Sequence, residues 1–191
     1  FIRDAADDPG TTTIKMTVYR LGDDTPFVRS LIKAAENGKQ VACLVELKAR
    51  FDEERNLHWA NELQKAGDHV IYGVRGLKTH TKLALVVRRE GDGLRAYAHI
   101  GTGNYHVKTA RMYTDFGLFT CDPVLTRDVV TLFHHLTGYS RSPRFEKLLV
   151  GTELFKMPQI TARLCGVCPA AHHLASVVAI ESGLGVTVPP A

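Results

Sequence analysis

Two spacings of apolar residues alternate along most of this chain. Short runs rich in β-branched and apolar residues, such as 14–20 and 41–48, have the length and composition of β-strands. Between these runs, apolar residues recur every three or four positions, which is typical of helices that bury one face. The expected strands are 14–20, 41–48, 70–74, 82–89, 94–101 and 115–121. The expected helices begin near Thr25, Phe51 and Pro123 and end at Gly38, Gly67 and Gly138.

The order of these elements indicates the fold class. Strands alternate with helices over the first part of the chain, and residues 90–93 (Glu-Gly-Asp-Gly) then join two strands as a hairpin. This order is typical of an α/β layer fold with a mixed sheet and flanking helices. In the helix that follows Phe51, the expected apolar side consists of Leu57, Trp59, Ala60 and Leu63.

Length and composition limit the number of domains. The chain has 191 residues, of which 45% are hydrophobic, enough for one ordinary domain and part of another. After about Val150 the sequence becomes nearly uncharged and contains two cysteines, and this segment is too short to form a domain. We therefore expect a domain over 1–150 and a short C-terminal segment over 151–191. The chain begins with Phe1, and we expect it to be a piece of a longer gene product.

Charge and cysteine content narrow the class of protein. The net charge of +4 favours polyanionic partners slightly but is too small to indicate nucleic acid. No apolar run approaches the roughly 18 residues of a membrane span. Cys43 and Cys121 lie in apolar runs and are expected to be buried thiols, and nothing indicates a disulfide framework. We expect a cytoplasmic protein, with association at a membrane surface left open.

The stretch "GLKTHTKLALVV" contains the first candidate chemistry. His80 lies between Lys78 and Lys82 at the start of a buried strand, and residues two apart in a strand share a face. Two neighbouring ammonium groups would lower the pKa of the imidazole, so it would be neutral at pH 7 with a lone pair able to attack. The same cations would attract an anion.

Other basic residues follow the neighbouring strands. Arg20 ends the first strand, Lys48 and Arg50 follow the second, and residues 101–104 (Gly-Thr-Gly-Asn) follow the second strand of the hairpin. Ligands of open α/β sheets bind beyond the carboxyl ends of strands. Guanidinium groups bind phosphate through two hydrogen bonds, and glycines let backbone N–H groups approach it. The pattern predicts an oxyanion site that contains a possible nucleophile.

Each of these residues also has a purely structural interpretation. His80 alone could be an ordinary surface or hydrogen-bonded histidine at a strand start. Arg20 and Arg50 could pair with the acidic residues of "ARFDEE". His99 is the nearest rival nucleophile, because it lies in the strand before "GTGN", but it lacks the paired lysines.

Four segments carry a resemblance to a known family. "TVYR", "ELKARFDEE", "GLKTHTK" and "HIGTGNYHVKTARMYTD" resemble polyphosphate kinase of the histidine-phosphorylating type, over about residues 1–150. The resemblance implies the first of two phospholipase-D-like catalytic domains. It implies that His80, with Lys82 of the H-x-K motif, is the phosphorylated catalytic nucleophile. The remaining implied roles are Arg20 and Arg50 at the Mg²⁺/phosphate site, and Tyr113, Asn104 and Lys78 in binding the nucleotide.

The resemblance also implies a function. The complete protein would transfer the γ-phosphate of ATP to inorganic polyphosphate through a phosphohistidine, reversibly, with ATP or ADP and Mg²⁺ bound. It would be a homo-oligomer and would not bind nucleic acid. The family's N-terminal region and its second phospholipase-D-like domain, which supplies a partner histidine, do not occur in this sequence. The isolated chain is therefore expected to be inactive.

The C-terminal segment resembles a different family. "ARLCGVCPAAHHLAS" is similar to the first cysteine motif near the N-terminus of the nickel–iron hydrogenase large subunit, over about residues 145–191. The resemblance implies that Cys165 and Cys168 bind nickel and iron, with His172 close by. Two thiolates do not complete a four-ligand site, so nickel and iron are not expected in this chain. The two resemblances meet around "RFEKLLVG", which makes the sequence a chimera of two families.

Three other functions remain as alternatives. A phospholipase-D-like phosphodiesterase would use the same histidine on a diester, although the density of arginine suits an anhydride chain better. The chain could instead be a nickel–iron hydrogenase fragment, or an α/β module with no catalytic activity.

Overall fold

The computed structural model describes residues 1–22, 25–47, 49, 52–73, 79–139, 144–147 and 177. The chain divides into two units, Phe1–Leu148 and Leu149–Ala191. Every element described below belongs to the first unit, and Val177 is the single described residue of the second. No helix of the described part has the length and apolar character needed to cross a membrane.

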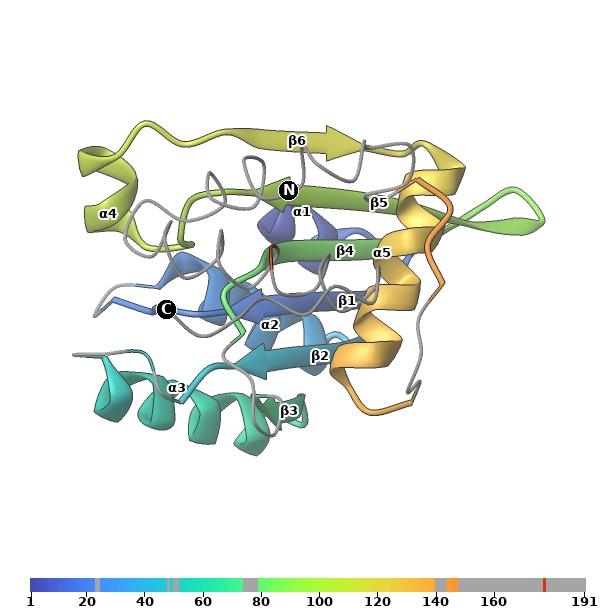
Figure 1. Cartoon of the computed structure of the whole chain (residues 1–191). Helices are drawn as coiled ribbons and strands as arrows, with labels where there is room; N and C mark the ends of the chain where they lie inside the picture. Colours follow the sequence, from blue (N-terminus) through green and yellow to red (C-terminus); the bar gives the residue numbers. More distant parts are fainter. Residues whose placement is uncertain are drawn as a thin grey trace. The chain divides into compact units, whose positions relative to one another are not determined.

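A six-stranded mixed sheet forms the centre of the first unit, with the order β3-β2-β1-β4-β5-β6 (Figure 1). The strands are β1 Thr11–Val18, β2 Gln40–Val45, β3 His69–Tyr72, β4 Lys82–Glu90, β5 Gly93–Gly101 and β6 Gly117–Thr120. Strands β1, β2 and β3 are parallel, whereas β4, β5 and β6 each run antiparallel to the preceding neighbour in the sheet. The predicted mixed sheet is confirmed.

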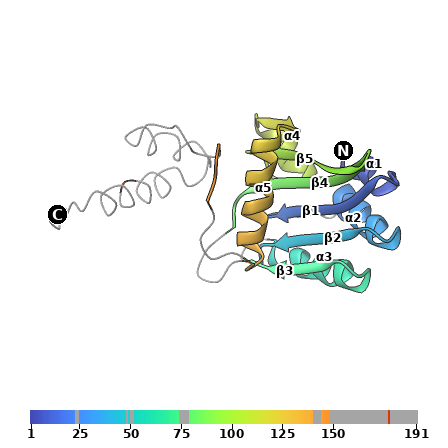
Figure 2. The ribbon, with the colours of Figure 1, turned by 90° about the vertical axis from the view of Figure 1, so that its right-hand side faces the viewer.

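Helices cover both faces of this sheet (Figures 1 and 2). Helices α1 Ile2–Asp7, α2 Pro26–Glu36 and α3 Glu53–Lys65 lie on one face, and α5 Pro123–Leu136 lies on the other. The short helix α4, Val107–Met112, follows β5 at the edge of the sheet. The α/β class with flanking helices is therefore as predicted.

Strand β4 contributes side chains to the hydrophobic layers on both faces of the sheet. Ala84 and Val86 belong to the core beneath α1, α2 and α3, whereas Leu83 and Leu85 pack with residues of α5. All four side chains are at most 2% exposed. Successive side chains of a strand point to opposite faces, so a strand covered on both sides is a continuous apolar run. This explains the unbroken run "LALVV".

Several boundaries and two burial assignments differ from expectation. Strand β1 ends at Val18 and β2 at Val45, so Arg20 lies in a loop, and helices α1 and α4 were not predicted. Leu57 is 47% exposed, whereas the adjacent Asn56 is fully buried. Adjacent helical positions lie about 100° apart, so an inward Asn56 turns Leu57 toward solvent. Hydrogen bonds to the main chain make the buried amide tolerable, as shown below.

The two described cysteines have different environments. Cys43 is buried and has a free thiol, as predicted, and desolvation raises its pKa. Cys121 is also a free thiol but is only partly buried, and its sulfur accepts a hydrogen bond from Arg95 at 3.3 Å. The prediction of a buried thiol is thus wrong for Cys121, because it follows the short edge strand β6.

Candidate functional site

Strand direction brings Arg20, His80, Lys82 and Asn104 to the same end of the strands, which we call an edge of the sheet. Parallel β1 and β2 end at the edge where antiparallel β4 begins and β5 ends (Figure 1). Arg20, His80 and Asn104 therefore follow or precede strand ends on the same side. Lys82 of β4 pairs directly with Gly101 of β5, so the H-x-K segment adjoins the glycine-rich turn. We call this edge, with Tyr19, Arg20, His80 and Lys82, the carboxyl edge.

His80 and Lys82 are in contact. The Lys82 Nζ atom lies 2.8 Å from Nδ1 and 3.1 Å from Nε2 of His80, and Lys82 is only 3% exposed. An ammonium group donates hydrogen bonds and cannot accept them. The imidazole nitrogen that accepts from Lys82 must therefore be unprotonated, so the contact suits a neutral His80 that carries a lone pair.

Tyr19 forms the wall of this contact. Its ring meets the His80 ring edge-on, with centroids 4.4 Å apart and an interplanar angle of 77°. The Lys82 Nζ atom also lies 5.5 Å from the centroid of the Tyr19 ring. Aromatic rings attract a cation at their faces, so Tyr19 stabilises the buried ammonium group and limits the movement of the imidazole.

Arg20 lies at the carboxyl edge in an ion pair. Its Nε is 3.0 Å from Oδ2 of Asp52, a carboxylate that is 7% exposed. Oδ1 of Asp52 is 3.1 Å from NH1 of Arg55. The pairing with Asp52 that the sequence left open is thus present as an ion pair at Nε of Arg20.

The glycine-rich turn packs against the segment before β6. The N–H of Thr102 donates to the carbonyl of Phe116 at 2.9 Å, and the Thr102 hydroxyl donates to Asp115 at 3.1 Å. A Cβ atom at Gly103 would lie 2.3 Å from an oxygen of Asp115, so glycine is needed for this close approach. We expected these glycines to admit phosphate, but at Gly103 the neighbour is a carboxylate of the chain itself.

Asn104 borders a cavity of about 470 Å³ between α2, α4 and the glycine-rich turn. Apolar and aromatic groups form much of its wall, including Phe27, Tyr105 and Phe116. The Oδ1 atom of Asn104 is buried and has no hydrogen-bond partner among the described residues. Tyr113, at the C-terminal end of α4, is 59% exposed. Both residues remain predicted nucleotide ligands.

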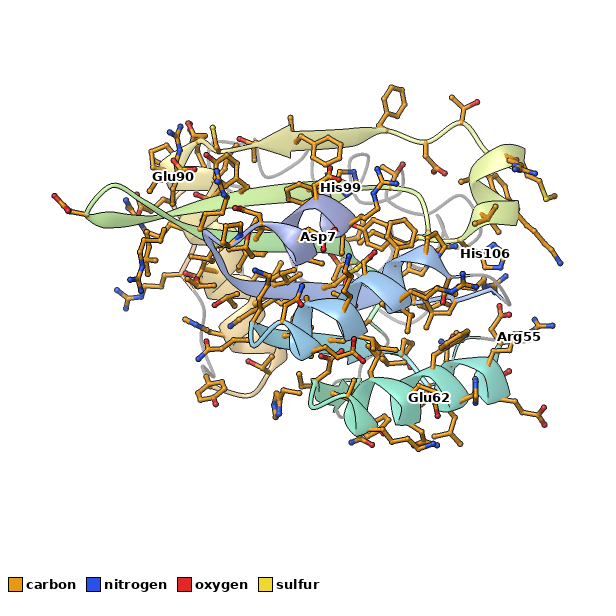
Figure 3. The ribbon with its side chains drawn as sticks, turned by 180° about the vertical axis from the view of Figure 1, so that it is seen from behind. Asp7, Arg55, Glu62, Glu90, His99 and His106 are labelled. Atoms are coloured by element: carbon orange, nitrogen blue, oxygen red, sulfur yellow. The ribbon has the colours of Figure 1, made fainter. Side chains whose placement is uncertain are left out.

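The rival histidine, His99, is packed rather than exposed (Figure 3). Its Nδ1 lies 2.8 Å from the Tyr105 hydroxyl, and its ring stands 4.5 Å from that of Phe119. Cβ atoms at Gly101 or Gly117 would come within 2.9 and 2.6 Å of the His99 ring. Desolvation lowers the pKa of His99, so the ring is held neutral.

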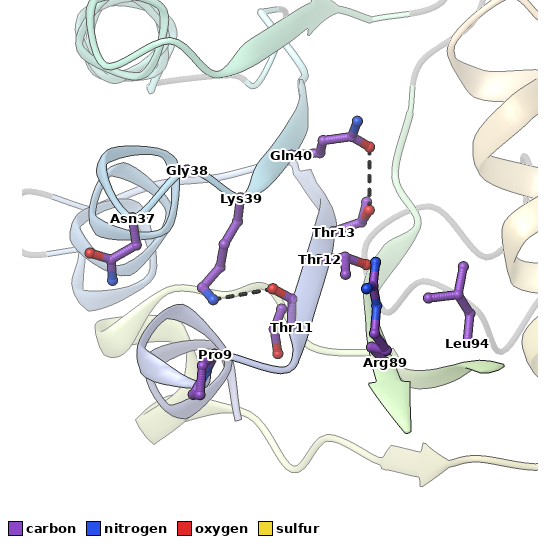
Figure 4. Close-up of a pocket in the computed structure, with 10 residues that line it drawn as sticks. All are labelled: Pro9, Thr11, Thr12, Thr13, Asn37, Gly38, Lys39, Gln40, Arg89 and Leu94. Atoms are coloured by element: carbon purple, nitrogen blue, oxygen red, sulfur yellow. Dashed lines mark hydrogen bonds between the residues drawn. The ribbon is translucent and has the colours of Figure 1, made fainter. Parts of the chain in front are cut away.

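A larger cavity, about 680 Å³, lies at the opposite edge, where β1 and β2 begin (Figure 4). Several of its polar groups are engaged in the fold. Lys39 Nζ donates to the carbonyl of Thr11 at 3.2 Å, and the Thr13 hydroxyl lies 3.4 Å from the Gln40 amide oxygen. We call this edge, with Asp8, Lys39, Arg88 and Glu90, the amino edge. None of the predicted site residues that the structure describes lines its cavity.

Four predicted site residues lie outside the described residues: Lys78, Arg50, Cys165 and Cys168. Within the described part, no group of three or more His, Cys, Asp or Glu side chains is arranged to hold a metal ion. Asp52, the acidic group beside Arg20, is bound to two arginines. The described groups thus suit a phosphate better than a magnesium ion bound by protein ligands alone.

Sequence reasoning missed Glu46 and Asn56. Both are buried polar residues that bind the main chain next to Tyr19, Arg20 and His80. A signal for Asn56 exists, since it precedes Ala60 and Leu63 at helical spacing, but its polarity argued for the surface. Glu46 directly follows a strand and could not be distinguished from the other charged residues of "ELKAR".

Comparison with known proteins identifies the family of the first unit. Residues 1–142 match the family described as Polyphosphate kinase C-terminal domain 1. The polyphosphate kinase of Synechocystis sp. is 63% identical over 150 residues, which is 78% of this chain and 21% of that protein. The Streptomyces coelicolor polyphosphate kinase is 57% identical over the same share of this chain and 20% of its own length.

A solved structure shares the fold. The crystal structure of polyphosphate kinase from Porphyromonas gingivalis matches with a TM-score of 0.66 and 37% identity, over 76% of this chain and 24% of that one. This chain spans about a fifth of the length of the curated relatives it matches. Residues 144–191 match a second family, described as Nickel-dependent hydrogenase.

Proposed function

Because the chain belongs to the Polyphosphate kinase C-terminal domain 1 family, we propose that its first unit carries the phosphoryl-accepting histidine of a polyphosphate kinase. In the complete protein, His80 takes the γ-phosphate of ATP and passes it to inorganic polyphosphate, reversibly. The observation that supports this assignment is the 2.8 Å contact between the buried Lys82 ammonium group and the His80 ring. It matches a nucleophile that must be unprotonated beside a group that attracts phosphate.

The transfer consists of two displacements. In the first, a lone pair of the His80 ring attacks the γ-phosphorus of ATP, a P–N bond forms, and the P–O bond to ADP breaks. In the second, a terminal oxygen of polyphosphate attacks the same phosphorus and the P–N bond breaks. The phosphohistidine bond is itself high in energy, so both steps are reversible between anhydrides.

Lys82 has two roles in this scheme. Before phosphate binds, its ammonium group donates to the imidazole and keeps the acceptor nitrogen free of a proton. When phosphate arrives, the ammonium group turns to a phosphoryl oxygen and releases the lone pair for attack. Arg20, oriented by Asp52, is placed to neutralise further charge. Magnesium would screen the phosphates of the nucleotide.

The remaining assignments concern the complete protein. We assign the first unit to a phospholipase-D-like half-site, which another domain would complete. Tyr113 and Asn104, with Lys78, bind the nucleotide, and Arg50 joins Arg20 at the phosphate. The domain boundary lies near Val150, as the two similarity ranges, 1–142 and 144–191, support. The complete enzyme is a cytoplasmic homo-oligomer that acts on ATP and polyphosphate.

Covalent labelling tests this proposal. The chain is incubated with γ-labelled ATP and, separately, with phosphoramidate, which phosphorylates histidine without a nucleotide site. Labelled protein should lose its phosphate in acid, retain it in base, and disappear in His80→Ala. His99→Ala is the matched control and should keep the label if it folds. Label that survives in His80→Ala would refute the assignment, and hydrolysis of a phosphodiester without labelling would favour the phosphodiesterase alternative.

The C-terminal segment has a separate candidate function. Its match to Nickel-dependent hydrogenase suggests that Cys165 and Cys168 descend from metal ligands. Nickel or iron detected by elemental analysis of the purified chain, and lost in Cys165→Ser, would show that the segment still binds metal. We expect neither metal, because only one C-x-x-C pair is present in the sequence.

A further inference from the structure

Asn56 joins the ends of two parallel strands from the buried side of α3. Its Nδ2 donates to the carbonyl of Tyr19 and to the carbonyl of Glu46, both at 2.9 Å. Its Oδ1 accepts from the N–H of Leu21 at 3.2 Å. Tyr19 and Leu21 are the residues before and after Arg20, so these two hydrogen bonds fix the main chain on both sides of that arginine. Asn56 is fully buried.

Glu46 continues this connection toward His80. It follows β2, is 3% exposed, and its Oε2 accepts from the N–H of Thr79 at 2.8 Å. Thr79 is itself buried and precedes His80. The main chain of Glu46 is also fixed, because its N–H donates to the carbonyl of Val18 at 2.9 Å and its carbonyl accepts from Asn56. The Glu46 carboxylate is therefore attached to a main chain that hydrogen bonds hold in place at the end of β2.

The bonds form one continuous path from Arg20 to His80. It runs from the main chain beside Arg20 through the Asn56 amide to Glu46, and from the Glu46 carboxylate to Thr79. Burying a carboxylate and a primary amide is unfavourable unless their hydrogen bonds are made. An apolar side chain in either place would leave strand-end groups without a partner, so the polar pair both satisfies the main chain and sets its position.

We propose that Asn56 and Glu46 are positioning residues that hold Arg20 and His80 in a fixed relative geometry for phosphoryl transfer. The inference rests on the proposed role of His80. In-line attack requires the reacting nitrogen within about 3–3.5 Å of phosphorus, and a shift of about 1 Å can lower the rate by roughly a hundredfold. The Glu46–Asn56 pair, which we call the clamp, prevents such a shift without touching the phosphate.

Variants of Glu46 separate positioning from general stability. Glu46→Met removes the acceptor of Thr79 at similar side-chain length, and Glu46→Asp withdraws it by one methylene while keeping the charge. Glu46→Gln retains an acceptor oxygen and is the conservative rescue. Val129→Ala, on α5 across the sheet, is the matched control, because it opens a cavity in the other hydrophobic layer.

The test measures the ligand-free chain by NMR. Hydrogen exchange of the Thr79 amide should accelerate about five- to tenfold in Glu46→Met and Glu46→Asp, as expected for one lost hydrogen bond. The ring signals of His80 should shift in the same variants, return toward wild type in Glu46→Gln, and stay unchanged in Val129→Ala. Should Glu46→Met not fold, Glu46→Asp decides by the same criterion. If Thr79 exchange and the His80 signals in Glu46→Met and Glu46→Asp matched those in Val129→Ala, the proposed positioning role of the clamp would be wrong.

A titration with inorganic tripolyphosphate, followed at the same His80 signals, separates this inference from the proposed function. If the wild-type signals do not respond to tripolyphosphate, the proposed phosphate site is wrong. The positioning role of the clamp is still tested by the spectra of the ligand-free variants. A saturable response in wild type that weakens about tenfold in Glu46→Asp, and not in Val129→Ala of similar stability, would support both.

Discussion

The basic side chains at the two edges of the sheet have different kinds of partner. At the amino edge, Arg88 pairs with Asp8 and with Glu90, and Lys39 donates to main-chain carbonyls. At the carboxyl edge, the buried Lys82 contacts the imidazole ring of His80 and lies near the face of Tyr19. Figure 3 separates the edges clearly, with Glu90 at one and Arg55 and His106 at the other.

The larger cavity therefore does not coincide with the edge at which His80 and Lys82 lie. The larger cavity, about 680 Å³, lies at the amino edge, where Arg88 pairs with acidic side chains and Lys39 donates to main-chain carbonyls. Such pairs stabilise the fold and leave little attraction for a ligand. A buried ammonium group beside an imidazole is costly for stability and is the kind of arrangement that active sites retain.

The largest change in stability is expected from Asp68. It lies at the amino edge but, unlike Asp8 and Glu90, does not pair with a basic side chain in the described part of the chain. It precedes β3, is 6% exposed, and neither carboxyl oxygen has a hydrogen-bond partner among the described residues. Desolvation raises its pKa from 3.8 to about 7. The folded state therefore binds the proton more tightly, and the stability from this group is full below pH 3.8 and is lost as pH rises through about 7.

Asp68→Asn should remove that dependence. At about pH 8 the variant should be more stable than wild type by roughly 2–4 kcal/mol, and near pH 4 the two should be similar. Urea unfolding at both values measures the difference. If the difference in unfolding free energy between variant and wild type did not change with pH, Asp68 would have a partner for its carboxylate, as Asp8 and Glu90 do.

Lys82→Met compares the edges directly. Loss of a charge-assisted bond should weaken binding of tripolyphosphate by about 1.5–3 kcal/mol. Thermal stability should stay level or rise, because an apolar side chain replaces a buried ammonium group. Lys39→Met at the amino edge should do the reverse, lowering stability and leaving affinity unchanged. Equal losses of affinity in both variants would mean that net charge, not the carboxyl edge, binds the phosphate.

Arg50→Ala extends the test to a residue outside the described range. If Arg50 joins Arg20 at the phosphate, affinity for tripolyphosphate should fall by about 1.5–3 kcal/mol, as measured by calorimetry. Arg55→Ala is the control, since Arg55 is bound to Asp52 and half exposed. An affinity that does not change in Arg50→Ala would place that side chain away from the site.

The smallest effect is expected from Asp8→Asn. The hydrogen bond from Arg88, with those from Gly10 and Thr11, lowers the pKa of Asp8 from 3.8 to about 2. This group stabilises the fold above pH 3.8, and the contribution is lost as pH falls through about 2. Calorimetry at neutral pH should show a melting temperature lower by a few degrees, with labelling of His80 intact. Loss of labelling in Asp8→Asn would show that the ion pair at the amino edge affects the reactivity of His80 at the carboxyl edge.

Much of the fold followed from local pattern, while parts of the site did not. The unbroken run of β4 and the Pro26 and Gly38 signals around α2 predicted those elements closely. The four quoted motifs placed the chain in its family. Asn56 was not among the residues expected on the buried side of its helix, because polarity alone favours the surface, and its three main-chain partners make it an interior residue.

The sequence alone determined the period of each element, their order, and the candidate nucleophile His80 with its neighbour Lys82. These follow from spacing within a few residues. The tertiary structure decided which charges are matched and which groups position others. Glu46 and Thr79 are 33 residues apart, and Asp8 and Arg88 are 80 apart. Such pairs depend on strand order and direction, and local spacing along a chain contains no information about either.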